Sequence, residues 1–170
     1  MFLPWIPARV PASRTENKME NEQTPIIRVM TLADYDKVYE LWMSCKNMGF
    51  NNLDDSREGI EKYLRRNPTT SFIAEEGERI VGVILAGHDG RRGFIHHMAV
   101  AEDCRRRGIA TGLLEHATAA LKEEGINKTA LLVFNRNEAG NAFWESSGFT
   151  ARTDVTYRNK AFVELIRHDT

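Results

Sequence analysis

The chain has 170 residues with a formal net charge of -1, and 28% of its residues are charged while 42% are hydrophobic. This length fits one domain with a short extension, and this composition excludes collagen-like and low-complexity chains. The nearly balanced charge argues against a protein that binds nucleic acid over its whole surface, and no apolar run reaches the roughly 18 to 20 residues of a membrane span.

Residues 1–24 differ from the rest of the chain, because three prolines interrupt every apolar run, at Pro4, Pro7 and Pro11. A secretory signal needs an unbroken apolar stretch, so we predict a disordered extension here. The domain is expected over residues 25–170. Met19, which opens the stretch Met-Glu-Asn-Glu-Gln, is a candidate for the natural start.

Hydrophobic periodicity predicts the elements that follow. A short strand over 26–30 precedes a capping box at Thr31–Asp34, which starts a helix that runs to about residue 45. The next predicted elements are a helix over 55–66, with Asp55 or Ser56 as its cap, and strands over 71–76, 79–88 and 94–100. A helix over 108–124 follows, and its periodicity turns Ile109, Leu113, Leu114, Ala117 and Leu121 inward. The last predicted elements are a strand over 128–135, a helix over 137–147, and strands over 150–155 and 161–167. The order β-α-α-β-β-β-α-β-α-β-β is typical of an α/β (α+β) fold in which a mixed sheet carries helices on its faces.

The segment that indicates chemistry joins the strand at 94–100 to the helix at 108–124. Three arginines stand directly before Gly108, and a small residue, Ala110, follows. A helix start has unpaired backbone N–H groups and the positive end of the helix dipole, which suit a phosphate, and Gly108 lets the main chain approach it closely. A solvated basic turn before an ordinary helix is the alternative. The sequence has no Walker-type or Gly-x-Gly-x-x-Gly motif, which argues against an NTPase and a Rossmann dinucleotide site.

The first block that resembles a known family is Arg105-x-x-Gly108-x-Ala110, which follows a strand ending in Met98-Ala-Val100. It is similar to the acetyl-CoA-binding motif of the GNAT superfamily of N-acetyltransferases. The resemblance implies that strand amides bind the pantetheine arm as an added strand would, and that the arginine loop and the helix start bind the pyrophosphate. The cofactor-binding residues that it implies are Met98, Ala99, Val100, Arg105, Arg106, Arg107, Gly108, Ile109, Ala110, Thr111, Asn137 and Trp144.

A second block, Val133 to Phe149, resembles the strand, helix and Gly-Phe ending of the same family. The resemblance spans about residues 26–167, and the stretch Gly87 to Gly93 is similar to its small bacterial RimI-like and YpeA-like branch. It implies a mostly antiparallel central sheet with helices on both faces, whose strands at 94–100 and 128–135 splay apart to admit acetyl-CoA. Asn137 has a second reading as an ordinary helix cap, and the two roles are compatible.

Trp144 departs from the family pattern, because many members have a tyrosine there that protonates the departing thiolate. Indole donates a hydrogen bond but is not a practical proton donor near neutral pH, so we interpret Trp144 as a pocket wall or a core residue. Tyr157, between the last two predicted strands, is the candidate replacement acid.

His96 and His97 are the candidate general bases, because an imidazole with a pKa of about 6.5 can accept the proton of an attacking amine. Alternation along a strand predicts that the two rings lie on opposite faces of the sheet, so that one of them reaches the substrate. The motif position favours His96. A histidine with purely structural hydrogen bonds is the alternative for each.

The sequence therefore predicts a single-domain N-acetyltransferase that moves an acetyl group from acetyl-CoA to an amine by direct attack in a ternary complex. The acceptor is left open between a small amine, an antibiotic and a protein N-terminus, with the region 35–50 as its candidate rim. One alternative is a non-catalytic domain that senses acyl-CoA, motivated by Trp144. The other is a nucleic-acid-binding module that uses Arg91, Arg92 and the arginines at 105–107, which the near-neutral charge disfavours.

The cysteine content and the charge limit which further partners are expected. Cys45 and Cys104 form neither a disulfide framework nor a Cys-x-x-Cys pair, and we interpret them as a core residue and a loop residue. We predict a cytoplasmic protein with no metal, no nucleic acid and no membrane among its partners. A homodimer is left open.

Overall fold

The fold is that of a computed structural model, which describes residues 24–170. Met19 and all but the last residue of the predicted extension lie outside this part. Five strands form the central sheet in the spatial order β1-β3-β4-β5-β6. Their bounds are β1 (Ile26–Val29), β3 (Phe72–Glu76), β4 (Arg79–His88), β5 (Gly93–Val100) and β6 (Thr129–Leu131). All neighbours pair antiparallel except β5 and β6, which are parallel, and this confirms the predicted mixed, mostly antiparallel sheet.

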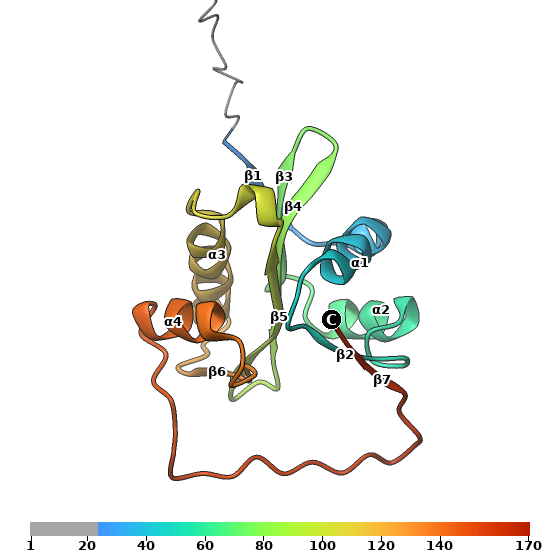
Figure 1. The fold of residues 1–170 in the computed structure, drawn as a ribbon, viewed down its shortest axis with the longest axis vertical. Coiled ribbons are helices and arrows are strands. Elements are labelled where there is room, and N and C mark those ends of the chain that lie inside the picture. The colour runs from blue at the N-terminus through green and yellow to red at the C-terminus, as the bar shows by residue number, and fades with distance from the viewer. Residues whose placement is uncertain (1–23) are drawn as a thin grey trace, which may run out of the picture.

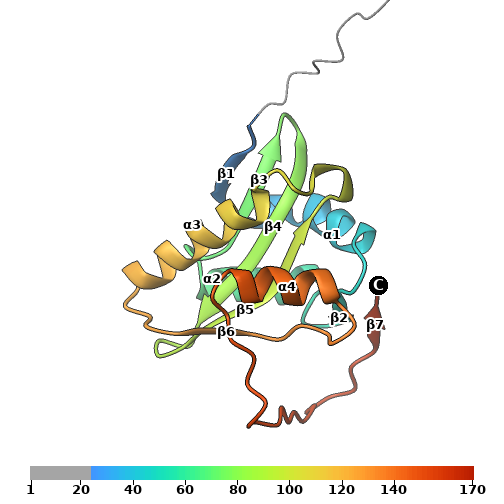
Figure 2. The ribbon, with the colours of Figure 1, turned by 60° about the vertical axis from the view of Figure 1, so that its left-hand side comes forward.

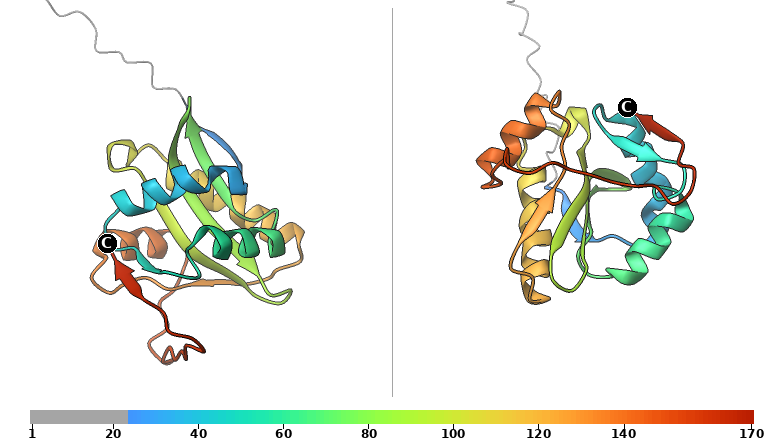
Figure 3. Two further views of the ribbon diagram at one scale, coloured as in Figure 1. Left: turned by 90° about the vertical axis from the view of Figure 1, so that its right-hand side faces the viewer. Right: turned by 90° about the horizontal axis from the view of Figure 1, so that it is seen from below.

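Helices cover both faces of the sheet, as predicted (Figure 1). The helices α1 (Tyr35–Ser44) and α2 (Arg57–Arg66) lie on one face, and α3 (Ile109–Glu123) and α4 (Glu138–Ser146) lie on the other, as the view from below in Figure 3 shows. The face of α3 that periodicity assigned to the core is buried, through Ile109, Leu113, Leu114, Ala117 and Leu121.

The beginnings of two helices confirm their predicted caps. The capping box at Thr31–Asp34 is present and forms a short 3-10 turn (Leu32–Asp34) before α1. Ser56 caps α2 by accepting a hydrogen bond from the backbone N–H of Gly59. Cys45 is buried in the core as predicted, and Cys104, in the 3-10 turn Glu102–Cys104, is buried as well.

The C-terminal part differs from the prediction. The strands predicted over 150–155 and 161–167 do not form; residues 150–166 have neither helix nor strand, and we call this segment the strap. It crosses from α4 to a three-residue strand, β7 (Arg167–Asp169), which pairs antiparallel with an unpredicted strand, β2 (Gly49–Asn51) (Figure 1). The strap contains β-branched and aromatic residues, but such propensity makes no strand unless a neighbouring strand supplies a hydrogen-bonding ladder.

The strand predicted over 128–135 is also shorter than expected, since β6 covers only Thr129–Leu131. The face that carries α3 and α4 is seen in Figure 2, with β6 and the strap below α4. Within residues 24–170, none of the helices has the length and apolarity needed to cross a membrane.

Gly59 provides a test of the packing between α2 and the loop before it. A Cβ at this position would clash with the backbone carbonyl oxygens of Leu53 and Asp54. Alanine favours a helix by about 1 kcal/mol over glycine, but overpacking costs about 1–3 kcal/mol, so we expect Gly59→Ala to lower the melting temperature. Gly112→Ala in α3 is the control, because its Cβ would meet only the tip of the Ile27 side chain, at 2.8 Å. A Gly59→Ala protein that melts at or above the wild-type temperature would contradict this packing.

Candidate active site

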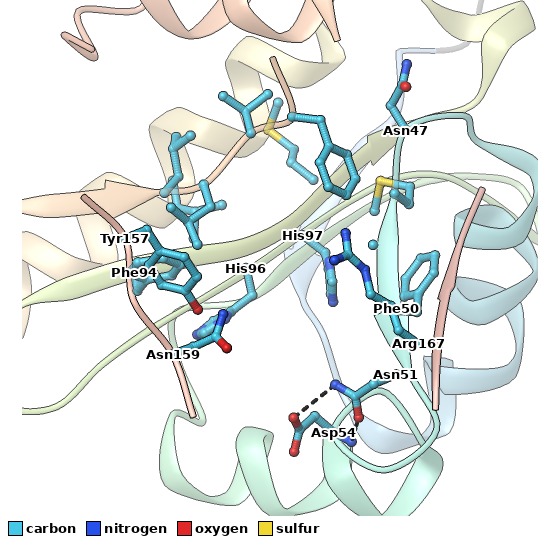
Figure 4. Close-up of a pocket in the computed structure, with 18 of the residues that line it drawn as sticks. Asn47, Phe50, Asn51, Asp54, Phe94, His96, His97, Tyr157, Asn159 and Arg167 are labelled. Atoms are coloured by element: carbon cyan, nitrogen blue, oxygen red, sulfur yellow. Dashed lines mark hydrogen bonds between the residues drawn. The ribbon is translucent and has the colours of Figure 1, made fainter. Parts of the chain in front are cut away.

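A cavity of about 880 Å³ lies between β5, β2, the strap and the segment that follows β6. This volume is in the range of small-molecule binding sites. Its walls come from four short segments, 47–51, 94–98, 131–134 and 157–161 without residue 158, together with Asp54, Asn137, Trp144, Leu165 and Arg167. The part of the candidate rim at 47–50 therefore borders the cavity. Figure 4 shows His96, His97 and Tyr157 among the side chains that line it.

The cavity begins where β5 and β6 separate. These strands pair only at Gly93–Thr129, Phe94–Ala130 and Ile95–Leu131. Beyond Ile95, β5 continues to pair with β4 as far as Val100, while the chain after Leu131 leaves the sheet. Within residues 24–170 no strand occupies the other edge of β5 there, so an extended ligand can add its own main-chain hydrogen bonds. Met98, Ala99 and Val100 lie along this edge.

A β-bulge overturns the prediction that His96 and His97 lie on opposite faces. Leu85 of β4 pairs with His97, while the next residue, Ala86, pairs with Ile95, so His96 is an extra residue in β5. Such a bulge breaks the alternation of side chains along a strand. Both rings consequently line the same cavity (Figure 4).

His97 is held by a buried carboxylate. Its Nε2 lies 2.7 Å from Oδ1 of Asp55, and both side chains are largely buried. The ring also packs between Trp42 and Phe50, with centroid distances of 5.0 and 5.1 Å. The other carboxylate oxygen of Asp55 accepts a hydrogen bond from the backbone N–H of Asn51 at 2.7 Å. His97 is thus fixed in orientation, with one ring nitrogen already engaged.

His96 has no such partner among the described residues, and its ring is accessible from the cavity. It packs against Tyr63 of α2 and Phe94, at centroid distances of 5.2 and 4.8 Å. Although water reaches the ring, these neighbours desolvate it, and this lowers the pKa of His96 below its ordinary value. The nearby His97 lowers this pKa further, while the carboxylates of Asp55 and Asp54 oppose the shift.

The start of α3 provides the expected anion-binding geometry. Gly108 is the N-cap with φ +79°, and no side chain caps the first turn of the helix. The first backbone N–H groups of the helix, from Ile109 to Thr111, therefore remain available to a ligand. A positive φ of this kind is adopted readily only by glycine.

The three arginines before Gly108 differ in their surroundings. Arg105 and Arg106 are exposed. Arg107 forms an ion pair with Glu76 at the end of β3, with an N–O distance of 2.6 Å. The side chain of Arg107 therefore anchors the loop to the sheet, and of the three arginines Arg105 and Arg106 are the ones open to solvent.

Three further predicted residues border the cavity. Asn137 caps α4, because its side chain accepts a hydrogen bond from the backbone N–H of Gly140 at 3.0 Å. Trp144 is buried and packs edge-on against Phe143 and Phe149, and it also lines the cavity, so it is at once core and wall. The side chain of Tyr157 is exposed on the strap and forms part of the cavity wall (Figure 4).

Sequence reasoning missed part of this site. Asp55 was considered only as a helix cap, and Arg167 only as the end of a strand. Neither stands in a motif, because each reaches the cavity through tertiary contacts: Asp55 through His97, and Arg167 through the pairing of β7 with β2. Within the described residues, no three or more His, Cys, Asp or Glu side chains are arranged to hold a metal ion.

Matches to a protein family and to curated proteins span most of the chain. Residues 35–149 match the acetyltransferase (GNAT) family. The protein named acetyltransferase SG1711 from Sodalis glossinidius (strain morsitans) is 30% identical over 138 residues, which cover 81% of this chain and 96% of that relative.

Solved structures show the same fold at lower identity. The ribosomal-protein-S18-alanine N-acetyltransferase from Escherichia coli superposes with a TM-score of 0.61 at 20% identity, over 73% of this chain and 76% of its own. AAC(6')-Iy, in complex with the bisubstrate analog CoA-S-monomethyl-acetylneamine, superposes with a TM-score of 0.63 at 18% identity, over 82% of this chain and 100% of its own.

The lowered pKa of His96 predicts a pH dependence of stability. Below its unfolded-state pKa of about 6.5, the unfolded chain binds a proton at His96 that the folded protein disfavours. Stability therefore falls as the pH drops from about 6.5 to the lowered pKa, and is constant in this respect at higher pH. When the pH is lowered from about 7.5 to about 5.5, we expect the melting temperature of His96→Gln to fall less than that of the wild type.

Thermal unfolding at both pH values measures this difference. His116→Gln on the exposed surface of α3 shows the effect of losing a histidine away from the cavity. If His96→Gln retains the full wild-type acid sensitivity, desolvation of His96 is contradicted.

Proposed function

The chain belongs to the GNAT acetyltransferase family, and on this basis we propose that it transfers the acetyl group of acetyl-CoA to an amine by direct attack in a ternary complex. One observation carries the proposal. The free edge of β5 runs from the cavity, with its two histidines, toward the uncapped start of α3. A thioester with a pantetheine arm and a pyrophosphate needs such a path.

The chain's own groups fit acetyl-CoA in two places. The backbone N–H groups of the first turn of α3, with Arg105 and Arg106 beside them, suit the pyrophosphate. The edge of β5 from Met98 to Val100 suits the pantetheine arm, and Asn137 faces the same cavity from the other side. Acetyl-CoA, when bound, supplies the activated acyl group of a thioester.

We assign the base to His96. An amine arrives mainly as its ammonium form and must lose a proton before or during attack on the thioester carbonyl carbon. His96 accepts that proton directly or through one water, because it is open to the cavity and its lowered pKa keeps it neutral near pH 7. His97, with Nε2 bound to Asp55, serves to hold the bulge and the wall beside it.

The carbon–sulfur bond breaks as the carbon–nitrogen bond forms, and the departing thiolate takes up a proton. Tyr157 is the residue of this chain that we assign to that step, since its phenol borders the same cavity. Trp144 forms the wall and exchanges no proton. The two solved structures point to different acceptors, since one is named for a ribosomal-protein alanine and the other holds an acetylneamine bisubstrate analog. The acceptor must therefore be argued from this chain alone.

Gly108→Glu tests the cofactor site. Bulk and negative charge at the start of α3 should reduce the affinity for acetyl-CoA by at least about 100-fold, because they oppose a pyrophosphate at the same amides. Gly125→Glu is the matched control, since Gly125 has φ +78° against +79° at Gly108 and, like it, open space around a Cβ. Calorimetric titration with acetyl-CoA measures both. Equal affinity in the two folded variants would contradict the assignment of this loop.

His96→Gln tests the base. We expect kcat/KM to fall about 10²-fold to 10⁴-fold, the usual range for general-base catalysis. In the wild type, kcat/KM should rise with pH through an apparent pKa below the ordinary histidine value, because desolvation favours the neutral ring. The readout is release of CoA thiol across a pH series, with His116→Gln as control. If His96→Gln keeps the wild-type rate and pH profile, the base is another group.

A further inference from the structure

The wall of the cavity carries charges of both signs. Asp54 lines the cavity, and both its carboxylate and that of the buried Asp55 are close enough to His96 to act on its charge. Arg167 and Lys160 line the same cavity. Lys160 has no hydrogen bond or ion pair in residues 24–170 of the structure.

Arg167 is fixed by an ion pair that leaves part of its guanidinium group available to a ligand. Its Nε and Nη2 donate to the two carboxylate oxygens of Asp169 at 2.9 and 3.0 Å, which leaves Nη1 outside this pair. The side chain is 64% exposed, so a ligand can reach it, and Figure 4 shows the guanidinium pointing into the cavity. The bidentate ion pair thus orients the guanidinium group without shielding it from a ligand.

Asp169 does not cancel the positive charge of Arg167, because a second arginine also pairs with the Asp169 carboxylate. Nη2 of Arg136 lies 3.7 Å from the Asp169 carboxylate. The guanidinium carbons of Arg136 and Arg167 lie 4.0 and 5.6 Å from the centre of the Phe134 ring, which lies against both of them. Two guanidinium groups and one carboxylate leave a net positive charge at this wall.

The acidic residues and Arg167 are linked by one strand pair. Arg167 of β7 is the register partner of Asn51 in β2. The Asn51 side chain accepts from the backbone N–H of Asp54 at 2.7 Å and donates to the Asp54 carboxylate at 3.0 Å, and its backbone N–H donates to Asp55. This pairing, with the hydrogen bonds of Asn51, therefore fixes where the turn that carries Asp54 and Asp55 lies relative to the strand that carries Arg167.

We propose that the acetyl acceptor is a small molecule that carries a carboxylate as well as its amine, an amino-acid-like compound. Arg167 binds the carboxylate, and Asp54 attracts the ammonium group toward His96. This proposal rests on the proposed acetyl transfer. A polycationic acceptor would meet repulsion from Arg167 and Lys160, and an amine without a carboxylate would leave the guanidinium without a ligand.

The test compares each acceptor with its own carboxamide. A panel of α-amino acids and of ω-amino acids of increasing chain length is assayed for release of CoA thiol, each beside the matching amide. For the best acceptor, we expect kcat/KM to exceed that of its amide by about 10-fold to 100-fold, as for a hydrogen bond to a charged group. Arg167→Gln should abolish this preference by lowering activity on the acid and not on the amide, whereas Arg167→Lys should retain part of it.

Arg158→Gln is the matched control, because Arg158 is an exposed arginine of the strap that does not line the cavity. It should keep the full preference for the acid. Turnover of amides as fast as acids by the wild type would overturn the carboxylate site while acetyl transfer stands. An equal loss on acid and amide in Arg167→Gln would also overturn it, since Arg167 would then only hold β7 in place.

If no acceptor is turned over, the proposed acetyl transfer fails, and binding still tests the carboxylate site. Thermal shift of the protein with saturating CoA, titrated with the amino acids and their amides, reports affinity without chemistry. A larger shift with acids than with amides, lost in Arg167→Gln and kept in Arg158→Gln, supports the site. Equal shifts with acids and amides contradict it.

Discussion

The parallel pairing of β5 with β6 stops after Ile95 and Leu131, and the functional part of the molecule depends on this early end. A sheet that stayed paired would satisfy both edges of β5 and leave no backbone groups for a ligand. Because the pairing ends, the edge of β5 up to Val100 remains open on one side while β4 holds it on the other. The edge is therefore both rigid and available, which is what recognition of an extended arm by main-chain hydrogen bonds requires.

The same strand carries the bulge that turns two successive histidines to one side. In a regular strand one of them would face the helices on the far side of the sheet. With the extra residue at His96, both rings line the cavity, and the two histidines can take different roles there. His97 binds Asp55 and packs on aromatic rings, so it is a fixed element of the wall. His96 stays open to the cavity beside it, and desolvation lowers its pKa.

Much of the fold could be predicted from the sequence, because periodicity reports burial and caps report helix starts. The core face of α3, the box at Thr31–Asp34 and the glycine before α3 all stand where local patterns placed them. The bulge could not be predicted, since it depends on the register between β4 and β5. The final strands were wrong for a related reason: residues 150–166 have strand-like composition, but pairing partners decide whether a strand forms.

The acceptor side of the cavity is the part that a linear motif could not describe. Residues near 50 and near 167 meet only because β2 and β7 pair over three residues. This short ladder places the turn with Asp54 and Asp55 next to the strand that carries Arg167. Such a ladder is weak by itself, yet it has further support. The backbone N–H of Thr170 donates to the carbonyl of Met48 at 3.0 Å, and Asn52 exchanges hydrogen bonds with Ile166. Residues 167–170 are consequently part of the candidate acceptor site. Substitutions among them should therefore affect binding of the acceptor and leave the binding of acetyl-CoA at α3 intact.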